Sequence, residues 1–460
     1  MARRAFCAIM IPVRRRRFLL QGEAARPELL GAEEKRMYVN GERAFDLLKR
    51  IGFTRVGGSE EECRAAQILR AECEAAGVPA VVEPFEIDDA ELEAAELEIL
   101  EPFRQTYPVT GYKCAQNTPE GGLAADFLYV EDATEVNLAD ARGKIVLVDG
   151  FMRVPLFRKL LDAGVVGIVT MEGALRDRLE ETDLSTRKLR GPLRAFGNAP
   201  MVHLRVRDAF DLVSRGACRA RLALKNTPVK KTSHNVVATI EGTERPDEIL
   251  SFGAHYDSVE FSTGVYDNGA GSVINMEILR WFREHPPRRT VKFMWYGSEE
   301  QGLEGSWAYV RAHAEELKKH LLMINVDIGG PVLGGDKATV TAEENLVHYL
   351  DYFTKLNGYS VAVNQGIYSS DSIPFADSGV PGVNFYRAGA EGAAYIHCRH
   401  DTLGFLSAAM LEKTAVHVLD FGRSMANAAV FPVARKIPEN MAEEVGKYLY
   451  KKELAELKAE

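Results

Sequence analysis

The sequence predicts an α/β protein with a mixed sheet that is parallel at its centre and sandwiched by helices, with a smaller β-rich domain inserted. After about residue 233, short apolar runs of strand length alternate with amphipathic stretches of helix length, which is typical of a largely parallel sheet. Between about residues 120 and 228, short strand-like segments dominate instead. With 460 residues, the chain is long enough for two or three domains that each bury a core.

The first 36 residues are expected to be a disordered extension, or to precede the true start at Met37. Their apolar run, residues 5–13, is followed at once by arginines, whereas a signal peptide has a longer apolar core and then a small-residue cleavage site. The run is also far shorter than the roughly 20 apolar residues of a membrane span. We therefore expect a cytoplasmic protein without a membrane span. Secretion is the alternative, and binding of the arginines to a membrane surface is a minor one.

Residues 37–119 and 229–435 are predicted to form the main domain. It begins with two helices in which apolar residues recur at helical spacing, 41–53 and 59–77, and continues with strands over 80–88 and 96–102. The inserted domain, residues 120–228, contains a helix over 154–164 that ends at a glycine, and strands over 143–150, 165–171, 199–206 and 217–225. A charged loop within it, residues 176–190, is expected to be exposed.

The second part of the main domain alternates strands with helices. The strands are predicted over 234–242, 248–257, 290–297, 321–330 and 382–387, and the helices over 269–285, 306–320, 344–358 and 407–428. Two consecutive prolines, Pro286 and Pro287, end the first of these helices. The last residues, 436–460, read as a charged helical tail that lies on the surface or contacts a partner.

Composition excludes several classes of protein. The net charge is −9 and the basic residues gather near the N-terminus, so the acidic body argues against nucleic-acid binding. The six cysteines are scattered without a CxxC pair, which argues against a thiolate zinc site and a disulfide framework. Reduced thiols in a reducing compartment are the simplest interpretation.

Imidazoles and carboxylates follow the predicted strands of the main domain at the points where the strands end. Because ligands of open α/β sheets gather at the carboxyl ends of the strands, these side chains are expected to meet on one rim. A set of histidine and carboxylate ligands without cysteine suits Zn²⁺, or less readily Mn²⁺ or Co²⁺. The residues are His255, Asp257, Asp267, Glu299, Glu300, Asp327, His397, His400 and Asp401.

Each of these residues alone has an ordinary explanation. Asp267 precedes a helix and is a plausible N-cap, the adjacent Glu299 and Glu300 would suit a solvated turn, and Asp327 stands before a glycine turn. Their joint occurrence at successive strand ends favours a metal site. Two neighbouring carboxylates also repel each other, which a positive group between them would relieve.

The motifs, taken in order, resemble one peptidase family. His-x-Asp at 255–257, DNGAG at 267–271, EEQGLEGS at 299–306, Asp327 and IHCRHDT at 396–402 are similar to those of the co-catalytic di-zinc aminopeptidases, which include bacterial leucine aminopeptidases, aminopeptidase Y and glutamate carboxypeptidase. The resemblance spans about residues 41–428 and includes FTRVGGSEEE at 53–62. It implies the phosphorylase/hydrolase-like fold of zinc peptidases, and the inserted region resembles a protease-associated domain.

The resemblance also implies a set of roles at the metals. Two Zn²⁺ ions per subunit would be held by His255 with Asp327 and by His397 with Glu300, while Asp267 bridges them. His400 is the rival of His397, but the second position of IHCRHDT favours His397. The peptide bond between Asp267 and Asn268 would be cis.

Two further carboxylates are predicted to act beside the metals. Asp257 follows His255 by two residues, so both side chains lie on one face of a strand and Asp257 can orient the imidazole. Glu299 is expected to remain free of metal. It would act as the general base toward a water held by the two zinc ions.

On the substrate side, we expect contacts from Tyr368, Asp371 and Tyr386. Relatives carry Ser-Asp-His where this chain has Ser-Asp-Ser, with Ser372 in the place of the histidine, which affects substrate preference and the placement of Tyr368. Other aromatic residues suggest an apolar pocket for the first side chain, although aromatic residues are more often part of a core. They are Trp295, Tyr296, Phe375 and Phe385.

These residues predict a metallo-aminopeptidase that removes N-terminal residues from peptides. A carboxypeptidase or dipeptidase of the same fold is the alternative, and Arg387 and Arg399 would then bind the substrate carboxylate. A binding protein on an inactive peptidase fold is a third possibility, but the complete ligand set and Glu299 argue against it. The sequence leaves the oligomeric state open, with a homodimer as one possibility.

Overall fold

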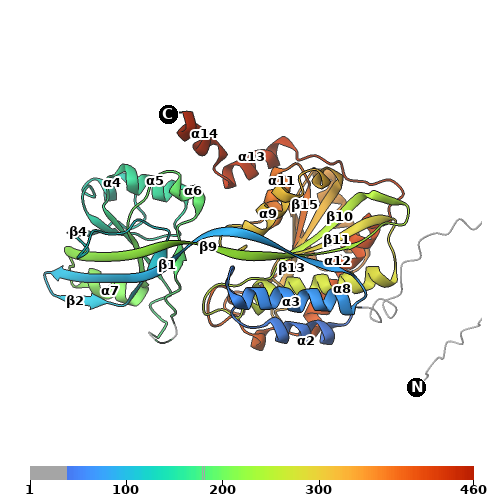
Figure 1. Cartoon of the computed structure of the whole chain (residues 1–460), viewed down its shortest axis with the longest axis horizontal. Helices are drawn as coiled ribbons and strands as arrows, with labels where there is room; N and C mark the ends of the chain where they lie inside the picture. Colours follow the sequence, from blue (N-terminus) through green and yellow to red (C-terminus); the bar gives the residue numbers. More distant parts are fainter. Residues whose placement is uncertain (1–38, 179, 181, 460) are drawn as a thin grey trace, which may run out of the picture.

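The computed structural model of the chain describes residues 39–178, 180 and 182–459, so the predicted N-terminal extension, residues 1–36, lies outside the described residues. The described chain forms a larger and a smaller lobe joined by two long strands, β1 (Ala80–Glu101) and β9 (Arg219–Ile240), which cross between them (Figure 1). The larger lobe contains α2, α3 and the elements from β10 onward. The smaller lobe contains the elements between β1 and β9.

The sheet of the larger lobe is mixed and parallel at its centre, as predicted. β10 pairs in parallel with both β11 and β12, and β12 pairs in parallel with β15. The antiparallel pairs lie outside this centre, between β9 and β11 and between β13 and β15. The strands are β10 (Arg245–His255), β11 (Arg289–Tyr296), β12 (His320–Val326), β13 (Gly334–Thr341), β14 (Val361–Gln365) and β15 (Gly382–Gly389).

Helices cover both faces of this sheet. Because successive side chains of a strand point to opposite faces, Phe293 and Trp295 of β11 join one hydrophobic core, and Met294 and Tyr296 join the other. The first core is covered by α2 (Gly41–Ile51), α3 (Glu60–Ala75), α8 (Ala270–Glu284), α10 (Glu344–Leu356) and α12 (Ala408–Ala426). The second is covered by α9 (Glu304–Ala312) and α11 (Ser372–Asp377).

The smaller lobe has a hydrophobic core of its own. Its strands are β3 (Val109–Lys113), β4 (Leu123–Tyr129), β5 (Ile145–Leu147), β6 (Gly167–Glu172) and β8 (Met201–Arg205), and its longer helices are α5 (Val154–Asp162) and α7 (Val206–Ser214). Buried residues of this core extend from Leu97 to Leu224. The core therefore begins on β1, well before residue 120, where the inserted domain was predicted to start.

Several predicted strands are parts of longer ones. The segments 80–88 and 96–102 belong to the single strand β1, and 217–225 and 234–242 both belong to β9. The two strands pair antiparallel from Ala80 opposite Ala238 to Glu101 opposite Arg219. Their polar middle parts are held by cross-strand ion pairs such as Lys231 with Asp89, at 3.1 Å. A stretch without apolar alternation was therefore mistaken for a break in the strand.

Two other predictions need correction. The predicted helix 306–320 is interrupted, because α9 ends at Ala312 and a 3-10 turn, η2 (Glu316–Lys319), precedes β12. The charged loop 176–190 is not simply exposed, since Asp183, Ser185 and Leu189 are buried.

The tail and the cysteines fit the predictions more closely. The tail forms two helices, α13 (Glu439–Tyr448) and α14 (Lys451–Ala459), which Figure 1 shows above the gap between the lobes. The cysteines of the described chain are free thiols. No helix among the described residues has the length and apolar character that a membrane crossing requires.

Candidate metal centre

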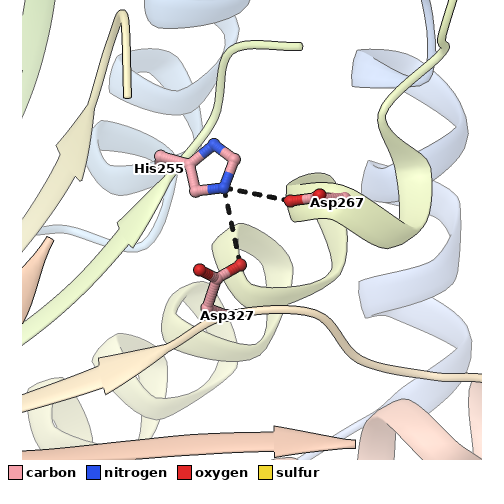
Figure 2. Close-up of side chains that lie close together, drawn as sticks. All are labelled: His255, Asp267 and Asp327. Carbon is pink, nitrogen blue, oxygen red and sulfur yellow. Dashed lines mark hydrogen bonds and ion pairs between the residues drawn. The ribbon is translucent and has the colours of Figure 1, made fainter. Parts of the chain in front are cut away.

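Three of the predicted ligands meet where β10 and β12 end. Figure 2 shows His255 at the end of β10, Asp327 directly after β12, and Asp267 in the turn that precedes α8. The Nε2 atom of His255 lies 3.2 Å from Asp267 Oδ1 and 3.5 Å from Asp327 Oδ1. His255 and the two aspartates are all buried. One imidazole nitrogen therefore faces two carboxylate oxygens in a place that bulk water hardly reaches.

The other two predicted ligands form a second group around the same aspartate. The Nε2 atom of His397 lies 3.1 Å from Asp267 Oδ2 and 3.1 Å from Glu300 Oε2. Asp267 thus offers one carboxylate oxygen to each histidine. The five residues predicted as ligands therefore form two triads that share Asp267.

Both triads have the donor set and spacing of a metal site. In each triad the ligand atoms lie within 4.8 Å of one another, which is compatible with Zn–N and Zn–O bonds of about 2.0–2.2 Å. Among the described residues, no donor forms a hydrogen bond with the buried oxygens Glu300 Oε1 and Asp327 Oδ1. An imidazole nitrogen carries one proton at most and cannot fully satisfy two carboxylates. Cations between these atoms would satisfy all of them.

The electrostatics of the two triads also favour bound cations. Burial raises the pKa of Glu299 well above its usual value, with Glu300 and Asp371 adding to the effect, and burial also raises the pKa of Glu300. The Glu300 carboxylate raises the pKa of His397 to about 11. A cation bound between His397, Asp267 and Glu300 would take the place of a proton on the His397 imidazole.

The backbone around Asp267 is fixed by several neighbours. The Asp267–Asn268 bond is cis, as the resemblance implies. The Asn268 side chain donates to the carbonyl of Val326, at 2.8 Å, and accepts from the N–H of Ile328, at 3.0 Å. Asp401 accepts the N–H groups of Tyr266, at 2.8 Å, and Asp267, at 3.2 Å.

Asp401 thus positions the shared ligand, a role that the sequence analysis did not assign. The sequence feature that could have indicated this role is the position of Asp401 in the IHCRHDT motif, four residues after His397.

Asp257 connects the first triad to the loop that carries the two glutamates. Its Oδ1 atom lies 3.4 Å from His255 Nδ1 and accepts the N–H of Glu299, at 3.0 Å. Its Oδ2 atom accepts the N–H of Glu300, at 3.3 Å. The predicted orientation of His255 by Asp257 agrees with this geometry, and the contact with both glutamate backbones was not anticipated.

Arg55 is a second residue that the sequence analysis missed. Its guanidinium is fully buried and donates to the carbonyl oxygens of Tyr256, Thr263 and Gly264, the last at 2.7 Å. These carbonyls belong to the segments that carry His255 and Asp267. Burial lowers the pKa of Arg55 to about 10, so it remains charged at neutral pH close to the carboxylates. The motif FTRVGG was noticed only as part of the resemblance.

Two of the predicted substrate-side residues contact each other, whereas the aromatic residues suggested for an apolar pocket are part of the core. The rings of Tyr368 and Tyr386 pack with centroids 4.5 Å apart, and both residues are half-buried. Asp371 and Ser372 are fully buried at the start of α11. The other aromatic residues proposed for the pocket are core residues with at most 1% of their surface exposed: Trp295, Tyr296, Phe375 and Phe385.

The remaining candidates lie away from the triads. His400 is exposed and its ring lies against Tyr395, so the structure supports His397 as the ligand. Arg387 is buried in an ion pair with Asp336, at 3.0 Å, which leaves it unavailable to a substrate carboxylate. Arg399 forms an ion pair with Asp183 of the smaller lobe.

Comparisons with known proteins agree with the motifs. Residues 235–422, which include the five predicted ligands, match the family model described as Peptidase family M28. Aminopeptidase YwaD of Bacillus subtilis (strain 168) is 25% identical over 438 residues, covering 90% of this chain and 89% of that protein. Carboxypeptidase Q of Mus musculus is 27% identical over 384 residues, covering 77% and 78%.

A solved structure supports the fold. The zinc aminopeptidase BSAP from Bacillus subtilis is similar with a TM-score of 0.71 at 23% identity, covering 88% of this chain and 99% of that chain. The predicted resemblance and the predicted mixed α/β fold are thereby confirmed.

The two histidines of the IHCRHDT motif provide a matched test of the second triad. We expect His397→Ala to weaken Zn²⁺ binding at one site by more than the 10–100-fold that loss of an outer-shell partner costs, because a direct ligand is removed. His400→Ala should bind Zn²⁺ like the unaltered protein. Isothermal titration calorimetry with Zn²⁺, on proteins stripped of metal by a chelator, measures the affinity of each variant. A loss of affinity in His400→Ala and none in His397→Ala would contradict the assignment.

Proposed function

Because residues 235–422 match the family model described as Peptidase family M28, we propose that this chain is a zinc metallo-exopeptidase that removes N-terminal residues from peptides. One observation carries the proposal. The two ligand triads share Asp267, and Glu299, which belongs to neither triad, adjoins one of them in the chain. Two metal positions beside a carboxylate that is not a ligand are what hydrolysis with a general base requires.

The proposed cofactor is a pair of Zn²⁺ ions, with Mn²⁺ or Co²⁺ as alternatives. His255 and Asp327 would hold one ion, His397 and Glu300 the other, and Asp267 both. When bound, such ions polarise a carbonyl group and make a water molecule more acidic. Each triad supplies one imidazole and carboxylate oxygens, which leaves coordination positions for substrate and water.

Glu299 is the proposed general base. Its backbone N–H is held by Asp257, so the residue is fixed relative to His255. Its carboxylate would take a proton from the attacking water and later deliver that proton to the amine of the departing peptide. The high pKa that burial gives Glu299 in the metal-free protein would fall when cations bind beside it.

The acidity of the centre favours a substrate with a free amino terminus. The metals would neutralise Glu300 and Asp327, but the Glu299 carboxylate would remain free of metal, and an α-ammonium group is attracted to such a carboxylate. The names of aminopeptidase YwaD and of BSAP agree with this direction of cleavage.

A carboxypeptidase or dipeptidase is the second candidate, and one observation favours it. Carboxypeptidase Q matches 77% of this chain at 27% identity. The structure weakens the predicted basis for that activity, however, because Arg387 is buried and Arg399 is engaged by Asp183. A non-catalytic binding role is disfavoured, because all five proposed metal ligands and the proposed general base, Glu299, are present.

We further propose that the smaller lobe, which resembles a protease-associated domain, narrows access to the centre. Its segment 183–190 contacts three catalytic loops of the larger lobe. Asp183 pairs with Arg399, the N–H of Thr186 donates to Glu260 at 2.9 Å, and Arg190 donates to the carbonyl of Glu300 at 2.8 Å. A segment in this place would block the passage of a continuous polypeptide through the site, and would so favour cleavage at a chain end.

A substrate panel tests the direction of cleavage. With added Zn²⁺, Mn²⁺ or Co²⁺, we expect hydrolysis of aminoacyl and short peptide substrates with a free N-terminus and no hydrolysis of their N-acetylated counterparts. Blocking the C-terminus as an amide should have little effect. Cleavage that requires a free C-terminus instead would establish the carboxypeptidase alternative.

Replacement of the proposed base should separate catalysis from metal binding. We expect Glu299→Gln to lower kcat by about 10²–10⁴-fold, the usual contribution of a general base, with the Zn²⁺ content unchanged. Glu391→Gln, a change at an exposed glutamate, serves as control. A Glu299→Gln enzyme with nearly normal kcat would exclude the proposed role.

Arg190 tests whether the smaller lobe acts on the catalytic loop. Arg190→Ala removes a hydrogen bond to Glu300, and a bond worth about 1 kcal/mol corresponds to a loss of roughly fivefold in kcat/KM. We also expect the preference for short over long peptides to decrease. Arg194→Ala is the matched control, because Arg194 follows this segment by four residues but faces Asp88 of β1, at 3.7 Å. Equal effects of the two changes would argue against the contact.

A further inference from the structure

The helix α13 lies against two loops of the larger lobe that adjoin the metal centre. Val445, Tyr448 and Leu449 share a small hydrophobic cluster with Leu303 and Ile373, with Ile367 and Trp307 packed against it. Leu303 follows Glu300 by three residues, and Ile367 directly precedes Tyr368. One apolar cluster thus connects the tail to the Glu299–Glu300 loop and to the loop that carries Tyr368.

A hydrogen bond connects the tail to the second of these loops. The hydroxyls of Tyr448 and Ser369 lie 2.6 Å apart, and Ser369 directly follows Tyr368. Ser369 is exposed, whereas Ser370 is buried and its hydroxyl accepts from Asn325 at 2.9 Å. The loop is therefore anchored to the sheet after Ser369 and to the tail at Ser369.

Other contacts hold the tail in this place. Lys451 forms an ion pair with Asp377 at the end of α11, and Asn440 donates to Gln365 at 3.0 Å, on the strand that leads into the loop. Tyr450 packs against the core of the smaller lobe. The tail therefore contacts both lobes on the side shown above their junction in Figure 1.

Tyr448 also lies within electrostatic range of the catalytic loop. Burial raises the pKa of its hydroxyl, and the Glu299 carboxylate acts in the same direction. Burial likewise raises the pKa of Tyr368, with contributions from Asp327 and Asp267. Tyr368 and Tyr448 thus both experience the charge of carboxylates at the centre, Tyr368 from the larger lobe and Tyr448 from the tail.

We propose that Tyr448 is a positioning residue for the 366–371 loop, and that α13 is a strut that sets the distance between Tyr368 and the Glu299 loop. This inference rests on the proposed function. A tyrosine hydroxyl beside the metals can donate a hydrogen bond to the carbonyl oxygen of the scissile peptide, where negative charge develops in the transition state. Displacement of the loop by a fraction of an ångström would weaken that bond without changing how the substrate first binds.

A double-mutant cycle tests the contact. Tyr448→Phe and Ser369→Ala each remove one partner of the 2.6 Å contact, so each should lower kcat about fivefold with KM changed less than twofold. The double variant should lose no more than either single variant, because both remove the same interaction. Ser369→Thr keeps a hydroxyl and should retain most of the activity.

Tyr349→Phe is the matched control. It also removes a tyrosine hydroxyl that faces a serine, Ser424 at 3.4 Å, but on the outside of α10. Unchanged kcat in Tyr448→Phe, or losses that multiply in the double variant, would overturn the inference. So would a fall in thermal stability without a change in kcat, since that would show a merely structural contact.

The failure of the inference and of the proposed function can be distinguished. If the unaltered protein with bound Zn²⁺ cleaves no peptide with a free N-terminus, the proposed function fails. If it cleaves such peptides and Tyr448→Phe cleaves them equally well, only the role of Tyr448 fails.

Discussion

The mutual repulsion of closely spaced, largely buried carboxylates is the constraint on which the centre depends. Asp257, Asp267, Glu299, Glu300 and Asp327 lie together at one edge of the sheet, and unpaired buried charge is costly. His255 and His397 face these carboxylates, and the Glu300 carboxylate raises the pKa of His397. Divalent cations would neutralise the carboxylates more completely, and the neighbouring residues are arranged to keep the carboxylates in place until cations bind.

That arrangement relies mainly on backbone groups. Asp257 and Asp401 use their oxygens to accept N–H groups from the glutamate loop and from the segment of Asp267. Arg55 donates hydrogen bonds to carbonyl oxygens of the segments that carry His255 and Asp267, and its positive charge lies close to the carboxylates. The ligands are thus oriented by residues that need not touch metal, which makes the site a rigid one whose geometry does not depend on the exposed loops alone.

The sequence was most informative where local chemistry and topology coincide. Ligands at the ends of parallel strands could be predicted because the strands are apolar runs and each is followed by a polar turn. The helix predicted over 59–77 from its apolar spacing is present as α3, and the Ser59 side chain caps it. The long pair β1 and β9 was not predictable in this way, since its middle is polar on both strands and is held by cross-strand ion pairs. Arg55 and Tyr448 contact residues far away in the sequence, and neither apolar periodicity nor motif spacing can predict such contacts.

The enclosure of the centre follows from the same long-range contacts. The metal ligands come from the larger lobe, yet the loop that carries Glu299 and Glu300 is contacted by Arg190 from the smaller lobe and by the cluster around α13. A catalytic loop that must bring two like charges close together benefits from support on several sides, because each added contact opposes the tendency of the carboxylates to separate. If the smaller lobe narrows access as proposed, the same contacts would also exclude an internal segment of a polypeptide from the centre. In the proposed function, one set of contacts would therefore both hold the general base in place and restrict cleavage to chain ends.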